Sequence, residues 1–172
     1  MSYVPSHASS LVLSQPVALT VIEHTGSTTQ TISVGNRVDI GTVHNWYGSF
    51  SPTISSDQIT LPSGYYYYIE SSIQAYKDGT FVDAMHTTFQ HYNETGSANI
   101  GTPSTITQIN EEDDLLFSRD DAARALIDCT SAAMDVSLKI TANTTFSHIN
   151  YNSGSYYIWA GLGRSVIWQL EG

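Results

Sequence analysis

Apolar and polar side chains alternate along much of this sequence, which is the pattern of a β-strand that buries one of its two faces. Residues 132–142 alternate most regularly, with polar side chains between the members of the apolar set Met134, Val136, Leu138 and Ile140. We therefore predict a strand here, with that set directed toward a core.

Residues 65–77 (YYYYIESSIQAYK) give the longest predicted strand. The more apolar face, which we expect in the core, carries Tyr65, Tyr67, Ile69, Ser71, Ile73 and Ala75. The opposite face carries Tyr66, Tyr68, Glu70, Ser72, Gln74 and Tyr76. Asp78 and Gly79 follow at once, and this dipeptide is a strong signal for a tight hairpin turn. We predict that residues 81–92 return antiparallel to residues 65–77.

Other strand-like runs are separated by turn residues at intervals of about 8–12 residues, and they lie at 17–22, 30–34, 44–47, 146–151, 156–160 and 165–170. Residues 93–110 are polar and rich in turn residues, so we expect loops there. Residues 118–129 fit a strand or irregular segment, which we favour in an otherwise all-β chain, or one short helix. The pattern predicts an all-β sandwich or barrel over residues 19–172, with residues 1–18 as an N-terminal arm.

The charge composition of the sequence limits the classes of partner that we expect. The chain has 172 residues, of which six are basic and sixteen acidic, for a formal net charge of −10. Nucleic acids and anionic membranes both attract clustered Lys and Arg, so we expect neither as a partner. No secretory signal and no apolar stretch of about 20 residues occurs, which predicts assembly in a cytoplasm. The single cysteine, Cys129, lies in an apolar run and is expected to be a buried thiol.

Patterns for catalysis or metal binding are weak. His86 and His91 are five residues apart on one predicted strand, so they should point to opposite faces and not chelate one ion. The acidic run at residues 111–114 lacks the spacing of a calcium-binding loop; a solvated loop is the simpler interpretation, and a Ca²⁺ ion there stays an open alternative. No nucleophile or phosphate-binding motif occurs. We therefore expect no enzyme, no cofactor and no metal site.

Aromatic content is unusual, with eleven Tyr and three Trp against five Phe. The four consecutive tyrosines at residues 65–68 cannot all enter one core, because successive side chains of a strand alternate. Tyr and Trp are favoured at interfaces, so we predict a subunit interface formed by Tyr66, Tyr68, Tyr76, Tyr157, Trp159 and Trp168. Stacking of exposed tyrosines on sugar rings is the alternative.

Three segments carry a resemblance to a known family. They are residues 59–70 (ITLPSGYYYYIE), residues 119–128 (RDDAARALID) with the alternating strand after them, and residues 157–171 (YIWAGLGRSVIWQLE). Together they resemble the TNF/C1q-like jelly roll over roughly residues 55–172, and most nearly the small TNF-like head decoration (cement) or fibre proteins of tailed bacteriophages. The resemblance implies two antiparallel sheets, a last strand in the middle of the inner sheet, and a homotrimer.

The resemblance also implies a role. We expect a virion protein that binds and stabilises a phage head, with the major capsid protein as its partner. The arm that would dock on the capsid contains Tyr3, Val4, Pro5, Leu11 and Leu13. One alternative is the receptor-binding tip of a tail fibre or spike, which would read a host surface glycan. A cupin-like metalloenzyme is a third alternative, from the class of enzymes.

Overall fold

The computed structural model describes residues 16–24, 29–73, 75–76, 84–111, 114–119, 122–144, 148–150 and 163–171. These residues form fourteen strands and no helix. The strands are β1 (Ala18–Glu23), β2 (Thr29–Thr31), β3 (Val43–Tyr47), β4 (Thr53–Ser55), β5 (Gln58–Leu61), β6 (Tyr65–Ser72), β7 (Ala75–Tyr76), β8 (Ala84–Asn93), β9 (Ala98–Glu111), β10 (Asp114–Arg119), β11 (Ala123–Asp128), β12 (Met134–Thr144), β13 (His148–Asn150) and β14 (Arg164–Glu171).

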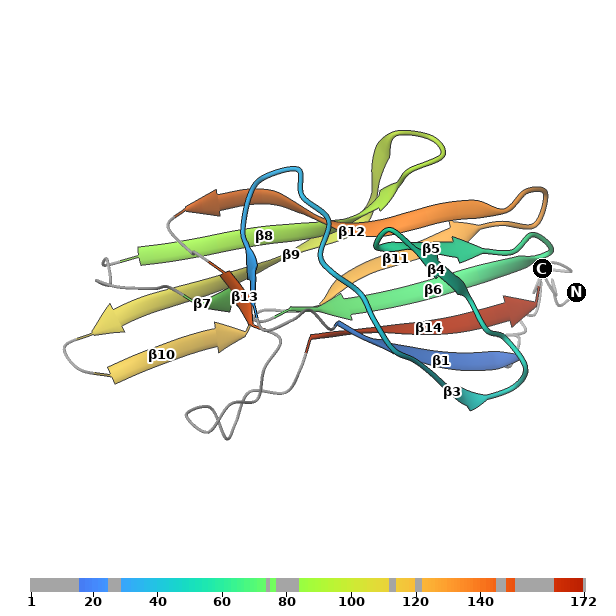
Figure 1. Cartoon of the computed structure of the whole chain (residues 1–172), viewed down its shortest axis with the longest axis horizontal. Coiled ribbons are helices and arrows are strands. Elements are labelled where there is room, and N and C mark those ends of the chain that lie inside the picture. The colour runs from blue at the N-terminus through green and yellow to red at the C-terminus, as the bar shows by residue number, and fades with distance from the viewer. Residues whose placement is uncertain are drawn as a thin grey trace, which may run out of the picture.

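The strands pair in the order β3-β1-β14-β6-β11-β9-β8-β12-β5-β4, with β10 added on β9. All of these pairs are antiparallel. Strands β11 and β9 are joined at one paired position, Arg124 with Thr102. Beyond this pairing the strands belong to two layers that share one buried cluster. The long strands of both layers run along the long axis of the molecule (Figure 1). We call the layer β3-β1-β14-β6-β11 the front sheet and the layer β9-β8-β12-β5-β4 the back sheet. Strands β2, β13 and β7 form a separate small sheet.

The core lies between the two layers because each strand turns alternate side chains inward. Strands β1, β6 and β14 show this most clearly, since buried and less buried residues alternate along them. One buried cluster joins both layers, and its members include Ile22, Tyr67, Ile69 and Ile167 of the front sheet and Leu61 and Val136 of the back sheet. A second cluster contains Ile32, Val38, Ile73, Phe89, Ile106, Ala123, Leu138 and Ile140.

Several predicted elements are confirmed. Met134, Val136, Leu138 and Ile140 lie on the inward side of β12, and the last three of them are buried. Residues 123–128 form a strand, as favoured, and not a helix. Strand β14 lies in the middle of the front sheet, between β1 and β6. Cys129 is a free, buried thiol. The arrangement is an all-β, antiparallel jelly-roll sandwich.

The predicted hairpin between residues 65–77 and 81–92 is wrong. Strand β6 pairs with β14 and β11 in the front sheet, whereas β8 pairs with β9 and β12 in the back sheet. The two strands therefore lie in different layers. Each has one apolar face, and placing them in facing layers buries both faces against each other, which a flat two-stranded hairpin does not do.

The predicted loop over residues 93–110 is also wrong, because β9 extends for 14 residues from Ala98 to Glu111. Its β-branched residues suit an extended strand, and Ser104 and Ile106 are buried on its inward side. The turn residues in this range occupy its start: Gly101 adopts a positive φ of 69° next to β11. Pairing with β8 along its length stabilises β9 as an extended strand, although the polar composition of this segment favours a loop.

Replacing Gly101 with Ala is expected to destabilise the sandwich strongly. A Cβ atom at this position would overlap the carbonyl oxygen of Arg124 and lie 2.7 Å from Ala125 Cα, where β9 meets β11. Gly35 is the matched control, since its φ is +91° and a Cβ there would meet nothing within 4 Å. We expect a loss of about 1–2 kcal/mol for Gly35→Ala and roughly 1–3 kcal/mol more for Gly101→Ala. Urea unfolding of both variants measures the difference, and equal losses would contradict the close approach.

Candidate functional site

The outward face of the front sheet carries a row of large apolar side chains that crosses all five strands. In the strand registers, Leu126 lies opposite Tyr68, Tyr68 opposite Trp168, Trp168 opposite Leu19, and Leu19 opposite Tyr47. At the two ends of the row, Leu126 is 68% exposed and Tyr47 is 63% exposed. We call this row and its outward-facing neighbours on the five strands the aromatic face.

The rows on either side complete the aromatic face. On one side, Tyr66 lies opposite both Leu170 and Asp128. On the other side, Val166 lies opposite both Glu70 and Val21. The face is therefore apolar at its centre and charged toward its rim, as in protein interfaces.

A small polar cluster adjoins the central row. The Tyr68 hydroxyl and Arg124 Nε both donate hydrogen bonds of 2.9 Å to Oε1 of Glu70. The Tyr68 and Trp168 rings lie next to it, with centroids 5.4 Å apart and planes tilted by 44°. These contacts link the Tyr68 ring and the Arg124 guanidinium to Glu70 on the outward side of the front sheet.

The structure brings together three of the residues predicted for the subunit interface, Tyr66, Tyr68 and Trp168. Tyr76 lies in β7, which pairs with β13 of the small sheet and with no strand of the front sheet. The other predicted residues lie outside the described part of the chain: Tyr157, Trp159, and the proposed arm residues Tyr3, Val4, Pro5, Leu11 and Leu13.

The sequence interpretation missed several members of the aromatic face, and Leu126 is the clearest case. Along β11, Ala123, Ala125 and Ile127 are buried while Leu126 is exposed. Leu126 therefore shares a face with the charged residues Arg124 and Asp128. A leucine in the polar phase of an alternating strand is a signal that the sequence contains and that could have identified this position.

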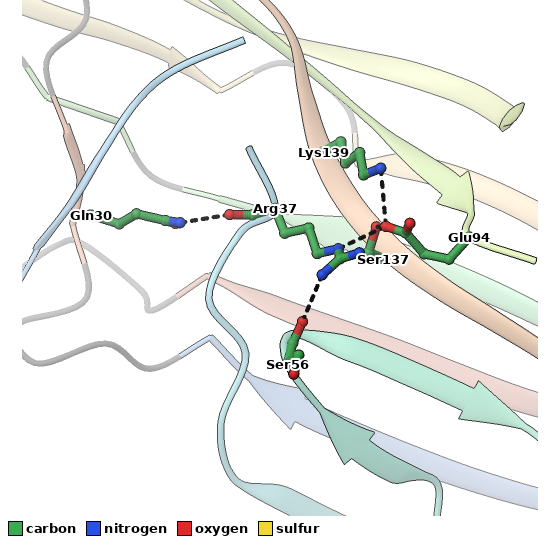
Figure 2. A network of polar contacts seen from close by, with 6 residues as sticks. All are labelled: Gln30, Arg37, Ser56, Glu94, Ser137 and Lys139. Atoms are coloured by element: carbon green, nitrogen blue, oxygen red, sulfur yellow. Dashed lines mark hydrogen bonds and ion pairs between the residues drawn. The ribbon is translucent and has the colours of Figure 1, made fainter. Parts of the chain in front are cut away.

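A second polar network lies on the outer side of the back sheet (Figure 2). Glu94 accepts hydrogen bonds from Ser137 Oγ at 2.6 Å and Arg37 Nε at 2.8 Å, and its Oε1 lies 3.1 Å from Lys139 Nζ. The hydrogen bond from Arg37 is the main reason that the pKa of Glu94 falls to about 2. Lys139 Nζ also lies 3.4 Å from the centroid of the Tyr92 ring.

A polar cavity of about 330 Å³ opens beside this network, lined by Gln30, Gly35, Asn36, Arg37, Asp39, Asp57 and Lys139. Many of its polar groups already bind within the chain. Gln30 Nε2 donates to the Arg37 carbonyl at 2.6 Å, and the backbone N–H of Asp39 donates to Gln30 Oε1. Asp57 Oδ1 accepts from the backbone N–H of Ile40. Because these bonds hold residues 37–40 in place, we assign a structural role to the polar groups that line the cavity.

The described residues show no group of three or more His, Cys, Asp or Glu side chains that could hold a metal ion. His86 is exposed and His91 is buried, which confirms that they point to opposite sides of β8. The open alternative of a Ca²⁺ ion at residues 111–114 falls on residues 112 and 113, which lie outside the described part of the chain. No helix in the described ranges is long and apolar enough to cross a membrane.

Comparison with known proteins places the fold. The architecture is similar to that of Eiger TNF from S. frugiperda, with a TM-score of 0.52 and 13% sequence identity, over 91% of this chain and 94% of the other. The chain thus has a TNF-like jelly-roll fold, which confirms the fold class that the sequence predicted. No protein family and no curated protein matches the sequence.

Replacing Glu94 with Gln is expected to lower the free energy of unfolding at pH 7 by about 2 kcal/mol, after allowance for solvent screening of its partners. Glu94 has a depressed pKa in the folded chain, so its contribution is present above its ordinary value of 4.5 and is lost as the pH falls toward about 2. The wild-type and variant unfolding curves should therefore converge in acid. Glu23→Gln, at a more exposed carboxylate 3.4 Å from His44, is the control and should change stability by less than about 1 kcal/mol.

Proposed function

We propose that this chain is a structural virion protein that forms a homotrimer through its aromatic face and decorates the head of a tailed phage. The observation that carries the proposal is the aromatic face itself. It is an aligned apolar row across five strands of an antiparallel TNF-like sandwich, exposed at both ends and partly exposed between them among the residues that the structure describes. The head location rests on the sequence resemblance to small phage decoration proteins.

The apolar centre of the face favours a covering partner. Soluble monomers rarely expose contiguous apolar patches larger than a few hundred Å². Leu126 and Tyr47 are more than half exposed, and Tyr68 and Trp168 are partly exposed between them. Burying Trp and Tyr side chains at the centre of an interface contributes strongly to association.

Charge on the face favours a second copy of this chain as the occupant. The chain carries only six basic residues, and Arg124 and Arg164 both lie in strands of this sheet at outward-facing positions. Glu70 and Asp128 supply acidic groups on the same face. Because both signs are present, copies of the chain can meet with opposite charges in contact despite a net charge of −10.

The two edges of the aromatic face carry different residues, and a threefold arrangement suits such an asymmetric face. Leu126 and Tyr47 stand at opposite edges of the front sheet, so one edge of a subunit can pack on the centre of the next. Contacts of this head-to-tail kind close into a ring when the rotation between copies closes. The Arg124–Glu70 pair would become buried there, where an ion pair sets register more than it adds stability.

In this proposal the protein acts by shape and burial, without catalysis or a cofactor. Cys129 supports this, because burial raises the pKa of its thiol and disfavours the reactive thiolate. Contact with the major capsid protein is assigned to the N-terminal arm and its residues Tyr3, Val4, Pro5, Leu11 and Leu13. Such a protein would be assembled in the host cytoplasm and carried on the virion.

Replacing Leu126 with Asp should break the trimer without unfolding the chain, because the side chain is 68% exposed in a single subunit. We expect native mass spectrometry at micromolar concentration to show a wild-type trimer and an association constant at least about tenfold lower for the variant, since each interface would bury an unpaired carboxylate. Val34→Asp is the matched control, at a 62% exposed apolar residue outside the front sheet, and should leave the trimer intact. A wild-type monomer under these conditions would contradict the proposal.

The role on the particle is tested by gold labelling of intact source particles with an antibody to this chain, imaged by electron microscopy. We expect many labels over the head. Label confined to the tail tip would overturn the decoration role and favour a receptor-binding tip that reads a host glycan. Binding of the purified chain to head shells before and after deletion of residues 1–15 would then test whether the arm makes the contact.

A further inference from the structure

A chain of four polar side chains crosses the interior of the sandwich. Nε2 of His24 lies 2.9 Å from Oγ of Ser165, Oγ of Ser165 lies 2.6 Å from Oγ of Ser71, and Oγ of Ser71 lies 2.9 Å from Nε2 of His91. All four residues are at most 2% exposed. His24 directly follows β1, Ser165 and Ser71 belong to β14 and β6, and His91 belongs to β8. The chain therefore connects the front sheet to the back sheet.

This polar chain adjoins both hydrophobic clusters. Near the end of β6, Ser71 falls between Ile69 of the first cluster and Ile73 of the second, which directly follows the strand. On β8, His91 follows Phe89 of the second cluster at the next inward position. Buried polar groups in such a place are costly unless each is hydrogen-bonded, so the integrity of this contact between the sheets depends on the hydrogen bonds.

The three hydrogen bonds determine how many protons the four polar side chains share. Three hydrogen bonds use the two serine hydroxyl protons and one imidazole N–H, so one histidine donates through Nε2 and the other accepts through Nε2. Nδ1 of both histidines is buried and has no hydrogen-bond partner among the described residues. At His24 the backbone closes this side, because a Cβ on Gly163 would lie 2.9 Å from Nδ1. When both imidazoles are neutral, all three hydrogen bonds form, and the cost is one unpartnered N–H at Nδ1 of the histidine that accepts.

Protonation of either His24 or His91 is unfavourable in the folded protein. A protonated imidazole donates from both nitrogens, so protonation adds a further buried donor without an acceptor and a charge without a counter-ion. Burial lowers the pKa of His24 to about 3, with a smaller contribution from His91, and burial lowers the pKa of His91 to about 4.

The charged groups on the surrounding strands do not face the two imidazoles. On β1 and β14, Glu23 and Arg164 occupy the outward phase next to the buried His24 and Ser165. On β6, Glu70 points outward and pairs with Arg124 of β11. On β12, Lys139 pairs with Glu94 on the outer side of the back sheet. Within the described chain, each imidazole therefore faces only the other as a titratable group.

We propose that the chain of His24, Ser165, Ser71 and His91 is an acid-sensitive connection between the two sheets, which opens when either histidine is protonated. The connection holds while both imidazoles are neutral. As the pH falls below about 6.5, the open or unfolded chain takes up protons that the closed sandwich excludes, and stability falls until the folded pKa values are reached. The inference concerns a single subunit and does not depend on the proposed trimer.

The test compares unfolding of the wild type with the double variant His24→Gln/His91→Gln as a function of pH. Gln keeps a hydrogen-bonding group near the position of Nε2 but does not titrate. The folding equilibrium constant of the wild type should fall about tenfold per histidine for each pH unit below about 6. That amounts to a combined loss on the order of a thousandfold between pH 6.5 and pH 4.5, which the double variant should lack. His86→Gln, at an exposed histidine of β8, is the control and should keep the wild-type dependence.

Two further measurements keep the test decisive. If the double variant does not fold, ring ¹⁵N spectra of the wild type still report on the inference. We expect two histidines that stay neutral down to the pH of unfolding, one protonated at Nε2 and the other at Nδ1. A histidine that titrates near pH 6.5 in the folded chain at either position would overturn the proposal. Repeating the pH series on Leu126→Asp separates this result from the proposed self-association, because the same acid loss should occur in the monomer.

Discussion

The register between β6 and β14 is the contact on which both notable features of this structure depend. It places Trp168 opposite Tyr68 on the outward side and Ser165 opposite Ser71 on the inward side. A shift of one residue would turn every side chain of one strand to the other face. The aromatic face and the buried polar chain are therefore two sides of one pairing, and neither can change register without the other.

The two faces of β6 were predictable from the sequence because they follow from local geometry. Alternation alone assigns Tyr67, Ile69 and Ser71 to the core and Tyr66 and Tyr68 to the outside, and the structure agrees. The pairing partners were not predictable in the same way. The Asp78-Gly79 dipeptide favours a local hairpin, but the choice between a hairpin and a crossover depends on which arrangement buries both strands, and this is a property of the whole sandwich.

This difference between local alternation and long-range pairing also explains which residues could be identified from the sequence and which could not. Tyr66, Tyr68 and Trp168 were identified because large aromatic side chains in an outward phase are conspicuous in a sequence. The relation between His24 and His91 was not, since 67 positions separate them (91 − 24) and two serines on two further strands, β14 and β6, join them. Contacts of this kind depend on long-range registers that no local pattern encodes.

The central position of β14 also has a consequence for the order in which the fold can form. Strand β1 pairs with β14 from Ala18 opposite Gln169 to Glu23 opposite Arg164, and β14 alone connects β1 to β6. Until residues 164–171 are available, the front sheet is divided into two parts, and the aromatic row has a gap where Trp168 belongs. Closing so long a loop is slow, so the aromatic face of a growing chain would remain incomplete until β14 had taken its place between β1 and β6.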